Sequence, residues 1–253
     1  MSAELARWPE GVGRVILPTT DSTMAEAARQ APHLPGPTWI CALAQTAGRG
    51  RRGREWKMPS GNFAASLVMQ PQGGAAQAAL RSFVAALALR DALGAVMGRP
   101  EGLALKWPND VLLNGGKVAG ILLESVGQGA RIDRLIIGVG VNLASAPDPA
   151  TLAPDAVRPV SLLGETGVAI VPEDFLTHLA HGFARWEQGF ATYGFGPIRT
   201  AWLRDAARIG QIITARTTRD AVTGTFVDVD MEGHLVLETP TGRQIIAAAD
   251  IFF

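Results

Sequence analysis

The sequence predicts an α+β fold, with a mixed β-sheet flanked by helices over residues 1–208 and a small SH3-like β-barrel over residues 209–253. Three observations support this prediction. Short apolar runs are interspersed with segments of helical periodicity before residue 210, and two of those segments are long enough for core helices. After residue 210 only short strand patterns and turn residues follow. A chain of 253 residues can build one large core and a small second unit.

Short apolar runs bounded by turn residues predict the strands of the larger sheet. These strands cover residues 12–17, 38–44, 63–69, 103–106, 111–113, 118–125 and 134–143. Prolines at positions 32, 35 and 37 predict a loop between the first two strands, because proline interrupts both helix and sheet hydrogen bonding. Residues 147–159 are predicted to form a second loop.

Helical patterns occupy four of the segments between and after these strands. They cover residues 23–30, 77–96, 173–190 and 197–210. Thr23 and Glu26 have the spacing of a capping box, which predicts a helix start. Apolar residues recur at i, i+3, i+4 and i+7 in the second helix, at Leu80, Phe83, Val84 and Leu87.

The C-terminal segment has a different character. Its predicted strands are residues 212–216, 223–230, 235–238 and 244–248. The turns between them include Glu232-Gly233 and Thr241-Gly242. A unit of this size is too small for an active site of its own, so a docking or lid function is predicted for it.

The composition excludes several classes of protein. Lysine plus arginine and aspartate plus glutamate number 23 each, so bulk attraction to nucleic acid is not expected. The single cysteine, Cys41, lies in an apolar run and is predicted to be a buried hydrophobic residue. No signal peptide or membrane-spanning run occurs, so a soluble cytoplasmic protein is expected. His178 and His181 lack neighbouring ligands, and no metal site is predicted.

The richest local motif is the Arg/Gly loop, defined as residues 48–54, in which four arginines and three glycines lie within seven positions. Glycine permits close approach of the backbone, and arginine donates in a fork that matches carboxylates and phosphates, so a mobile anion-binding loop is predicted. Its glycines also fit a dinucleotide fingerprint and Walker A spacing. Pro59 and Gly61 prevent the helix that the fingerprint needs, and Arg54-Glu55 replaces the Walker lysine and hydroxyl residue.

A second motif runs from Lys106 to Lys117. The Gly115-Gly116 pair predicts a two-residue hairpin that pairs Asn114 with Lys117 and Val111 with Gly120. In that register Asp110 and Lys117 share one face, roughly 13 Å apart, and an elongated ligand could span them. Gly120 would allow a ligand to approach closely. An alternative interpretation makes Lys106 and Asp110 a surface ion pair.

Together these motifs resemble the biotin protein ligases. The resemblance rests on residues 45–54, 106–110, 117–124 and 138–142, in the order and spacing of that family. It extends from about Asp21 to the C-terminus, and it implies the short form without an N-terminal helix-turn-helix domain. Members of the family form biotinyl-5′-adenylate from biotin and ATP, and then transfer biotin to one lysine of a biotin carboxyl carrier protein.

The resemblance also implies which residues contact each substrate. The expected biotin contacts are Ser22, Thr23, Met24, Gln45, Arg49, Gly50, Arg51, Lys117 and Gly120. The expected nucleotide contacts are Arg54, Trp56, Lys106, Asn109, Asp110 and Asn142. Many members have asparagine at the position of Met24, so one polar contact is missing here.

The chemistry of the reaction assigns catalytic functions to three of these residues. The biotin carboxylate and the α-phosphate repel each other, and Lys117 and Arg51 are the cations expected where they meet. Asp110 is the expected base for the acceptor lysine. Mg²⁺ is expected to balance the pyrophosphate, with help from Asn109 and Asp110, but no dedicated metal cage is predicted.

Two other functions are weighed against this one. A lipoate or octanoate ligase shares the fold, but the chain lacks the Arg-Arg…Gly-Gly-Gly loop and the His-Asp pair of that family. A biotin-sensing DNA-binding regulator is disfavoured by the zero net charge. The identity of the carrier protein, the order of substrate binding and the choice between monomer and homodimer stay open.

Overall fold

The computed structural model describes residues 6–127, 132–151, 156–217 and 220–252. A seven-stranded mixed sheet in the order β1-β2-β3-β7-β6-β5-β4 forms the larger part of the molecule. Only β1 and β2 are parallel, and all the other neighbours are antiparallel. The strands are β1 (Gly13–Leu17), β2 (Thr38–Ala42), β3 (Phe63–Met69), β4 (Leu103–Lys106), β5 (Asp110–Leu113), β6 (Gly116–Val126) and β7 (Arg134–Val141).

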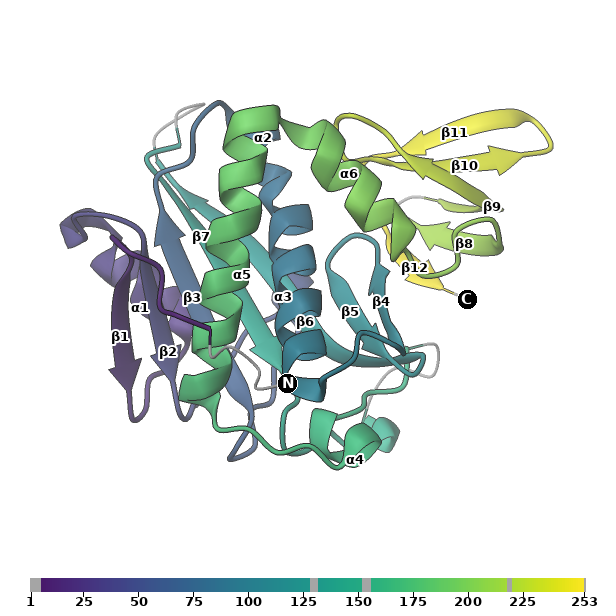
Figure 1. Cartoon of the computed structure of the whole chain (residues 1–253). Helices are drawn as coiled ribbons and strands as arrows, with labels where there is room; N and C mark the ends of the chain where they lie inside the picture. The colour runs from purple at the N-terminus through teal and green to yellow at the C-terminus, as the bar shows by residue number, and fades with distance from the viewer. Residues whose placement is uncertain (1–5, 128–131, 152–155, 218–219, 253) are drawn as a thin grey trace.

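Helices cover both faces of this sheet, and α3 and α5 lie side by side on one of them (Figure 1). The helices are α1 (Thr23–Gln30), α2 (Ala75–Ala79), α3 (Arg81–Met97), α4 (Leu162–Thr166), α5 (Pro172–Tyr193) and α6 (Phe195–Arg204). Short 3₁₀ turns occur at Ala31–His33, Arg51–Gly53 and Pro149–Thr151. No helix in the described ranges has the length and apolarity needed to cross a membrane.

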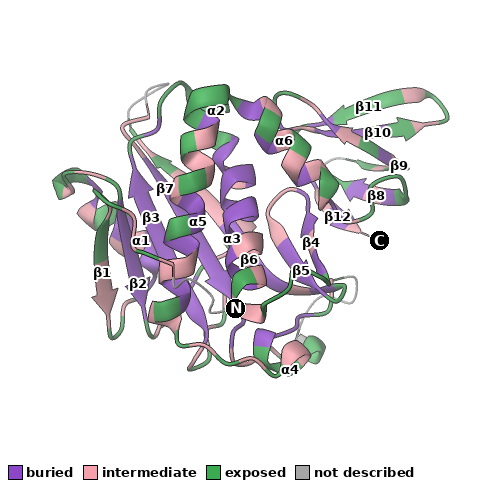
Figure 2. Cartoon of the chain, viewed as in Figure 1, coloured by how far each residue is buried: buried purple, intermediate pink, exposed green. Residues whose placement is uncertain are grey.

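Strand alternation divides the core into two parts. Trp39 on β2 faces the helix pair, and its ring makes an edge contact with Phe183 of α5 at 5.9 Å. Ile40, the next residue, points to the opposite face and packs in a smaller cluster with Met24 and Ala27 of α1. The central strands are therefore buried on both sides (Figure 2).

The predicted strands and helices all occur, with some corrections at their ends. Ser22, rather than Thr23, is the N-cap of α1, and its hydroxyl accepts a hydrogen bond from the Met24 amide. The predicted helix over residues 77–96 is two helices, because α2 and α3 meet at Leu80 without forming one continuous element. α6 ends at Arg204, and the positive φ of Arg208 and Gly210 excludes a helix reaching residue 210.

The C-terminal strands form a five-stranded antiparallel sheet in the order β11-β10-β9-β8-β12. Their bounds are β8 (Ile212–Arg216), β9 (Ala221–Val229), β10 (Leu235–Thr239), β11 (Gly242–Ile246) and β12 (Asp250–Phe252). The predicted short strands are present, but within the described residues β11 does not pair with β12, so the sheet is open rather than a closed barrel. The β10–β11 hairpin projects away from β12, which keeps the two edge strands apart (Figure 1).

Candidate active site

A cavity of about 580 Å³ lies between the Arg/Gly loop, the strands β5, β6 and β7, and the start of β12. This volume is in the range of small-molecule binding sites. Every candidate residue named from the sequence lines it: Ser22, Thr23, Met24, Gln45, Arg49, Gly50, Arg51, Arg54, Trp56, Lys106, Asn109, Asp110, Lys117, Gly120 and Asn142. The fold therefore brings the four segments that carry the resemblance, together with residues 22–24, to one site.

The Arg/Gly loop is folded back on itself like a hairpin. The Gly50 amide donates to the Arg54 carbonyl at 2.7 Å, and the Trp56 amide donates to the Gly48 carbonyl at 2.9 Å. A side chain at Gly48 would place its Cβ 2.4 Å from the Trp56 carbonyl oxygen, so only glycine fits there. The tip is a 3₁₀ turn in which Arg52 has a φ of 57°.

Two glycines form a flat floor beneath the indole ring of Trp56. Gly120 of β6 and Gly140 of β7 are direct partners in the sheet. A Cβ on Gly140 would lie 2.4 Å from Cε2 of the indole ring, which explains the absence of a side chain there. The indole Nε1 of Trp56 is buried and has no hydrogen-bond partner among the described residues. The indole therefore lies flat on the two glycines, with this donor enclosed against the sheet.

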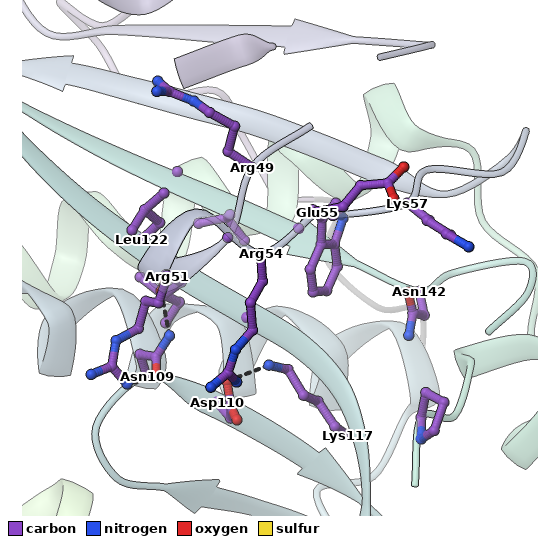
Figure 3. A pocket seen from close by; sticks show the side chains of 18 of the residues that line it. Arg49, Arg51, Arg54, Glu55, Lys57, Asn109, Asp110, Lys117, Leu122 and Asn142 are labelled. Carbon is purple, nitrogen blue, oxygen red and sulfur yellow. Dashed lines mark hydrogen bonds and ion pairs between the residues drawn. The ribbon is translucent and has the colours of Figure 1, made fainter. Parts of the chain in front are cut away.

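Asp110 lies at the centre of the charged part of the cavity. Its carboxylate is 2.7 Å from Nζ of Lys117 and 3.9 Å from Nζ of Lys106. Beside it, Arg51 donates to Oδ1 of Asn109 at 3.1 Å, and Nδ2 of Asn109 donates to the Ile121 carbonyl. Figure 3 shows the hydrogen bond between Arg51 and Asn109 next to the ion pair of Lys117 with Asp110.

This geometry corrects the predicted hairpin. Asp110 pairs with Gly120, and a bulge after Val111 shifts Lys117 opposite Leu112. The positive φ angles of the turn are at Asn114 and Gly115, not at Gly115 and Gly116. The predicted separation of roughly 13 Å between Asp110 and Lys117 is therefore wrong, because the bulge brings the two side chains into contact.

Gly116 is a glycine for a different reason from the one predicted. A Cβ at this position would lie 2.3 Å from Cγ1 of Val160, so close packing requires the glycine. The interpretation of Lys106 and Asp110 as a surface ion pair is also wrong, since Lys106 is only 8% exposed.

Burial and charge act together on the cations of the site. Burial lowers the pKa of Lys106, and the neighbouring charge of Asp110 offsets part of that effect. Burial likewise lowers the pKa of Arg51, against the opposing charges of Asp250 and Asp110. Three cations surround the single carboxylate of Asp110, and this surplus of positive charge suits an anionic ligand.

The other end of the cavity is a small polar group at the start of α1. Oε1 of Gln45 accepts from the Thr23 amide at 2.8 Å, and the Ser66 hydroxyl donates to Oγ1 of Thr23 at 2.9 Å. Ser22 and Thr23 are both buried. Met24 is buried next to them and packs against Gly138. This end can hydrogen-bond a polar ligand group and cover it with apolar surface.

Asn142 has a structural contact in addition to lining the cavity. Nδ2 of Asn142 donates to the Val160 carbonyl and so fixes the chain after β7. Cys41 lies outside the cavity lining and is fully buried, and burial raises its pKa to about 12. The interpretation of Cys41 as a hydrophobic core residue is therefore confirmed.

Several residues that line the cavity could not be predicted from the sequence. Asp250, Ile251 and Phe252 of β12 reach it from the C-terminal sheet, and Pro159 reaches it beside Lys117. None of these residues belongs to a local motif. The excess of arginine in the Arg/Gly loop predicted an anionic ligand, not a contact with an acidic residue of the same chain.

Comparison with known proteins identifies the family. The model of the biotin/lipoate A/B protein ligase family matches residues 12–142, and that of the biotin protein ligase C terminal domain matches residues 209–253. A biotin–[acetyl-CoA-carboxylase] ligase of Paracoccus denitrificans is 58% identical over 94% of this chain and 99% of its own length. A bifunctional ligase/repressor of Bacillus spizizenii is 33% identical over 93% of this chain and 71% of its own.

A solved structure has the same fold. The biotin protein ligase from Aquifex aeolicus, in complex with biotin and ATP, superposes with a TM-score of 0.78 and covers 94% of this chain and 97% of its own. Its sequence identity is 24%, so it supports the fold alone. Since the first family model spans more than half of the chain and the Paracoccus enzyme matches almost all of it, the chain belongs to the biotin/lipoate A/B protein ligase family and, within it, to the biotin protein ligases.

Proposed function

We propose that this chain activates biotin with ATP as biotinyl-5′-adenylate and transfers the biotin to a lysine of a biotin carboxyl carrier protein. The observation that carries this function is the meeting of the Arg/Gly loop, the Lys106–Asp110 segment and Lys117 around one cavity. The match to the biotin protein ligase C terminal domain favours biotin over lipoate. The name of the Paracoccus relative supports acetyl-CoA carboxylase as the source of the carrier.

The two ends of the cavity suit the two substrates. The polar group at the start of α1, with Ser22, Thr23 and Gln45, suits the ring system of biotin, which carries hydrogen-bonding groups on an apolar frame. The Trp56 indole, which lies over the floor of Gly120 and Gly140, offers an aromatic surface against which the adenine of a nucleotide can stack. The charged centre between them suits the carboxylate and the phosphates.

The first step joins two anions. An oxygen of the biotin carboxylate attacks the α-phosphorus of ATP, the bond to the β-phosphate oxygen breaks, and pyrophosphate leaves. We assign Lys117 and Arg51 to this meeting point, because both line the charged part of the cavity. Their charges would lower the repulsion between the reacting anions and stabilise the charge that develops on the phosphate.

The second step passes biotin to the carrier. The ε-amine of the acceptor lysine attacks the biotinyl carbonyl, the bond from carbon to the phosphate oxygen breaks, and AMP leaves. The attacking amine loses a proton, and we assign Asp110 as the group that accepts it. Its contacts with Lys117 and Lys106 keep the carboxylate in a fixed position.

Mg²⁺ is proposed to enter with ATP rather than to occupy a site built by the protein. Within the described residues the carboxylates that line the cavity belong to Glu55, Asp110 and Asp250, and the last two are paired with cations. Oδ1 of Asn109 already accepts from Arg51. This set of oxygens does not suit a protein cage for Mg²⁺, which requires a near-octahedral set of free oxygens.

The test is a transfer assay with labelled biotin, ATP, Mg²⁺ and the biotin carboxyl carrier domain of an acetyl-CoA carboxylase. Label is expected on the carrier and not on a carrier whose acceptor lysine is replaced by arginine. Parallel reactions contain labelled lipoate or octanoate. Efficient transfer of either acid in place of biotin would contradict the proposal, as would the absence of label on the intact carrier.

A further inference from the structure

Three arginines of the Arg/Gly loop approach one carboxylate of the C-terminal sheet. Oδ2 of Asp250 is 2.9 Å from Nη1 of Arg52 and 2.7 Å from Nη2 of Arg54. Nη1 of Arg51 is 4.0 Å from Oδ1 of the same carboxylate. The Asp250 side chain is 19% exposed, whereas those of Arg52 and Arg54 are 40% and 68% exposed, so the carboxylate is the shielded side of the contact.

The two sides of this contact differ in how firmly they are held. Asp250 is the first residue of β12, where it pairs with Arg216 of β8. Its neighbours Ala249 and Ile251 are buried in the core. The arginines lie on a loop held by a few backbone hydrogen bonds. The carboxylate is therefore the fixed partner and the loop is the part that it positions.

The charges at the contact leave the loop able to bind a further anion. Burial alone would raise the pKa of Asp250, but the hydrogen bond from Arg54 and the charges of the three arginines outweigh it, so the pKa lies below its usual value. Asp250 is thus ionised at neutral pH. One carboxylate cannot neutralise three guanidinium groups, and Arg51 and Arg54 also line the cavity.

We propose that Asp250 is a positioning residue that latches the Arg/Gly loop to the C-terminal sheet and so holds Arg51 and Arg54 over the reaction intermediate. The intermediate that is retained is biotinyl-5′-adenylate, a mixed anhydride of a carboxylic acid and a phosphate. The identity of this intermediate rests on the proposed function. Through this contact the C-terminal sheet positions the loop arginines for the reaction. In this proposal β12 supplies no group that takes part in the chemical steps.

The latch is tested first without any substrate. Trypsin cleaves after arginine, so the rate of cleavage within residues 48–54 reports how often the loop opens. Asp250→Asn keeps the size of the side chain and removes its charge, and it should speed this cleavage by roughly three- to tenfold. Asp250→Glu should restore a rate within about twofold of the original, since it keeps the carboxylate.

A matched control lies in the same sheet. Glu238 pairs with Arg243 of β11 and has no contact with the loop, so Glu238→Gln should leave cleavage of residues 48–54 unchanged. Equal thermal midpoints of the variants would show that the increase in Asp250→Asn comes from the loop and not from global unfolding. Equal loop cleavage in Asp250→Asn and the unmodified protein would overturn the proposal.

A double-mutant cycle tests whether the effect passes through the ion pair itself. Arg52→Gln removes a latch partner that does not line the cavity. Asp250→Asn should then accelerate cleavage less in the Arg52→Gln background than in the unmodified protein, because the two residues share one interaction. Independent, multiplying effects of the two substitutions would contradict a latch that includes Arg52.

The last measurement concerns the reaction. Asp250→Asn should release more biotinyl-5′-adenylate per adenylate formed than the unmodified protein, measured as biotin attached to added serum albumin. Glu238→Gln should release no more than the unmodified protein. If the unmodified protein forms no adenylate, the proposed function is wrong. The trypsin experiment still tests whether Asp250 holds the Arg/Gly loop, because it needs no substrate. If adenylate forms and Asp250→Asn releases it no faster, the latch proposal fails and the proposed function stands.

Discussion

At the scale of single residues, Lys117 has the contacts expected of a group that neutralises an anion. It is 2.7 Å from Asp110, and its Nζ lies 5.8 Å from the ring centroid of Trp56. Its side chain is 31% exposed to the cavity side of the sheet, so its charge can reach a ligand. A phosphate entering the cavity would meet Lys117 without any rearrangement of the sheet.

Lys117→Ala is therefore expected to slow adenylate formation by a factor on the order of 100 or more, because it removes a charge from the point where two anions react. The fold should be retained, since Lys106 still faces Asp110. ATP–pyrophosphate exchange measures the step, and circular dichroism checks the fold. Lys57→Ala is the control, because Lys57 is an exposed lysine that lines the same cavity. ATP–pyrophosphate exchange near the normal rate in Lys117→Ala would show that Lys117 does not assist adenylate formation.

Arg51 is expected to act on retention of the intermediate as well as on its formation. Arg51→Gly removes a charge-assisted donor and loosens the loop, which otherwise keeps water from the anhydride. The variant should still make adenylate but should label serum albumin at least about threefold more per adenylate formed. The comparison is made at matched adenylate production. Albumin labelling at the level of the unmodified protein would mean that Arg51 does not retain the intermediate.

The residues of the cavity could be predicted where they lie in short motifs, and Asp250 could not. Lys106, Asp110 and Lys117 follow one another closely in the sequence, and their types indicated the chemistry. The contact of Asp250 with the loop joins residues that lie 196 and 198 positions apart in the sequence through the packing of two sheets. No local pattern records such a contact.

At the scale of elements, the Arg/Gly loop combines a short hairpin with a strained tip. Its backbone hydrogen bonds fix Gly48 and Gly50, while Arg52 at the tip has a positive φ, which is unusual for a residue with a side chain. The arginines gain further partners only when an anion arrives. Binding should therefore lower the frequency of opening of an already folded loop.

Trypsin cleavage near Arg51 is expected to slow when biotin and ATP are both present, because the bound anions add charge-assisted contacts to the loop arginines. A fivefold change in rate, the order expected for about 1 kcal/mol of added interaction, is easily measured. In the control, trypsin cleavage is measured with biotin present and with ATP replaced by an unreactive carboxylic acid. The same cleavage rate with and without the substrates would contradict closure of the loop on them.

Element boundaries were predictable where propensity and periodicity agreed, as for β3 and α1. The register of the β5–β6 hairpin was not, because Gly115 and Gly116 are alike in sequence and only packing against Val160 distinguishes them. α4 and β12 were missed because both are short. Their positions depend on tertiary contacts, which local patterns do not encode.

At the scale of the whole molecule, Trp107 joins the two sheets directly, and β4 is also hydrogen-bonded to the connection that leads from α6 to the C-terminal sheet. Nε1 of Trp107, a buried residue next to Lys106, donates to the Gly233 carbonyl in the turn between β9 and β10 at 3.0 Å. The Leu105 amide donates to the Asp205 carbonyl, and the Ala207 amide donates to the Leu105 carbonyl, both at 2.8 Å. The Lys106–Asp110 segment therefore lies between the sheets and depends on both.

This coupling predicts that the two proposed domains, residues 1–208 and 209–253, unfold in one cooperative transition. Trp107→Phe removes a buried hydrogen bond and part of the packing, so it should lower the free energy of unfolding by about 2 kcal/mol. Trp8→Phe is the matched control, because the Trp8 indole also donates to a backbone carbonyl, that of Val12, but is half-buried and far from the junction in sequence. Trp8→Phe should lower the free energy of unfolding by less than Trp107→Phe does.

Urea unfolding followed by circular dichroism gives the free energies, and hydrogen exchange of peptides from each sheet tests the coupling. In the unmodified protein both sheets should exchange their slowest amides with the same free energy of opening. In Trp107→Phe the C-terminal sheet should lose protection together with the Lys106–Asp110 segment, because the two share the Gly233 contact. Two separate transitions in the unmodified protein, or unaltered stability in Trp107→Phe, would show that the junction does not couple the sheets.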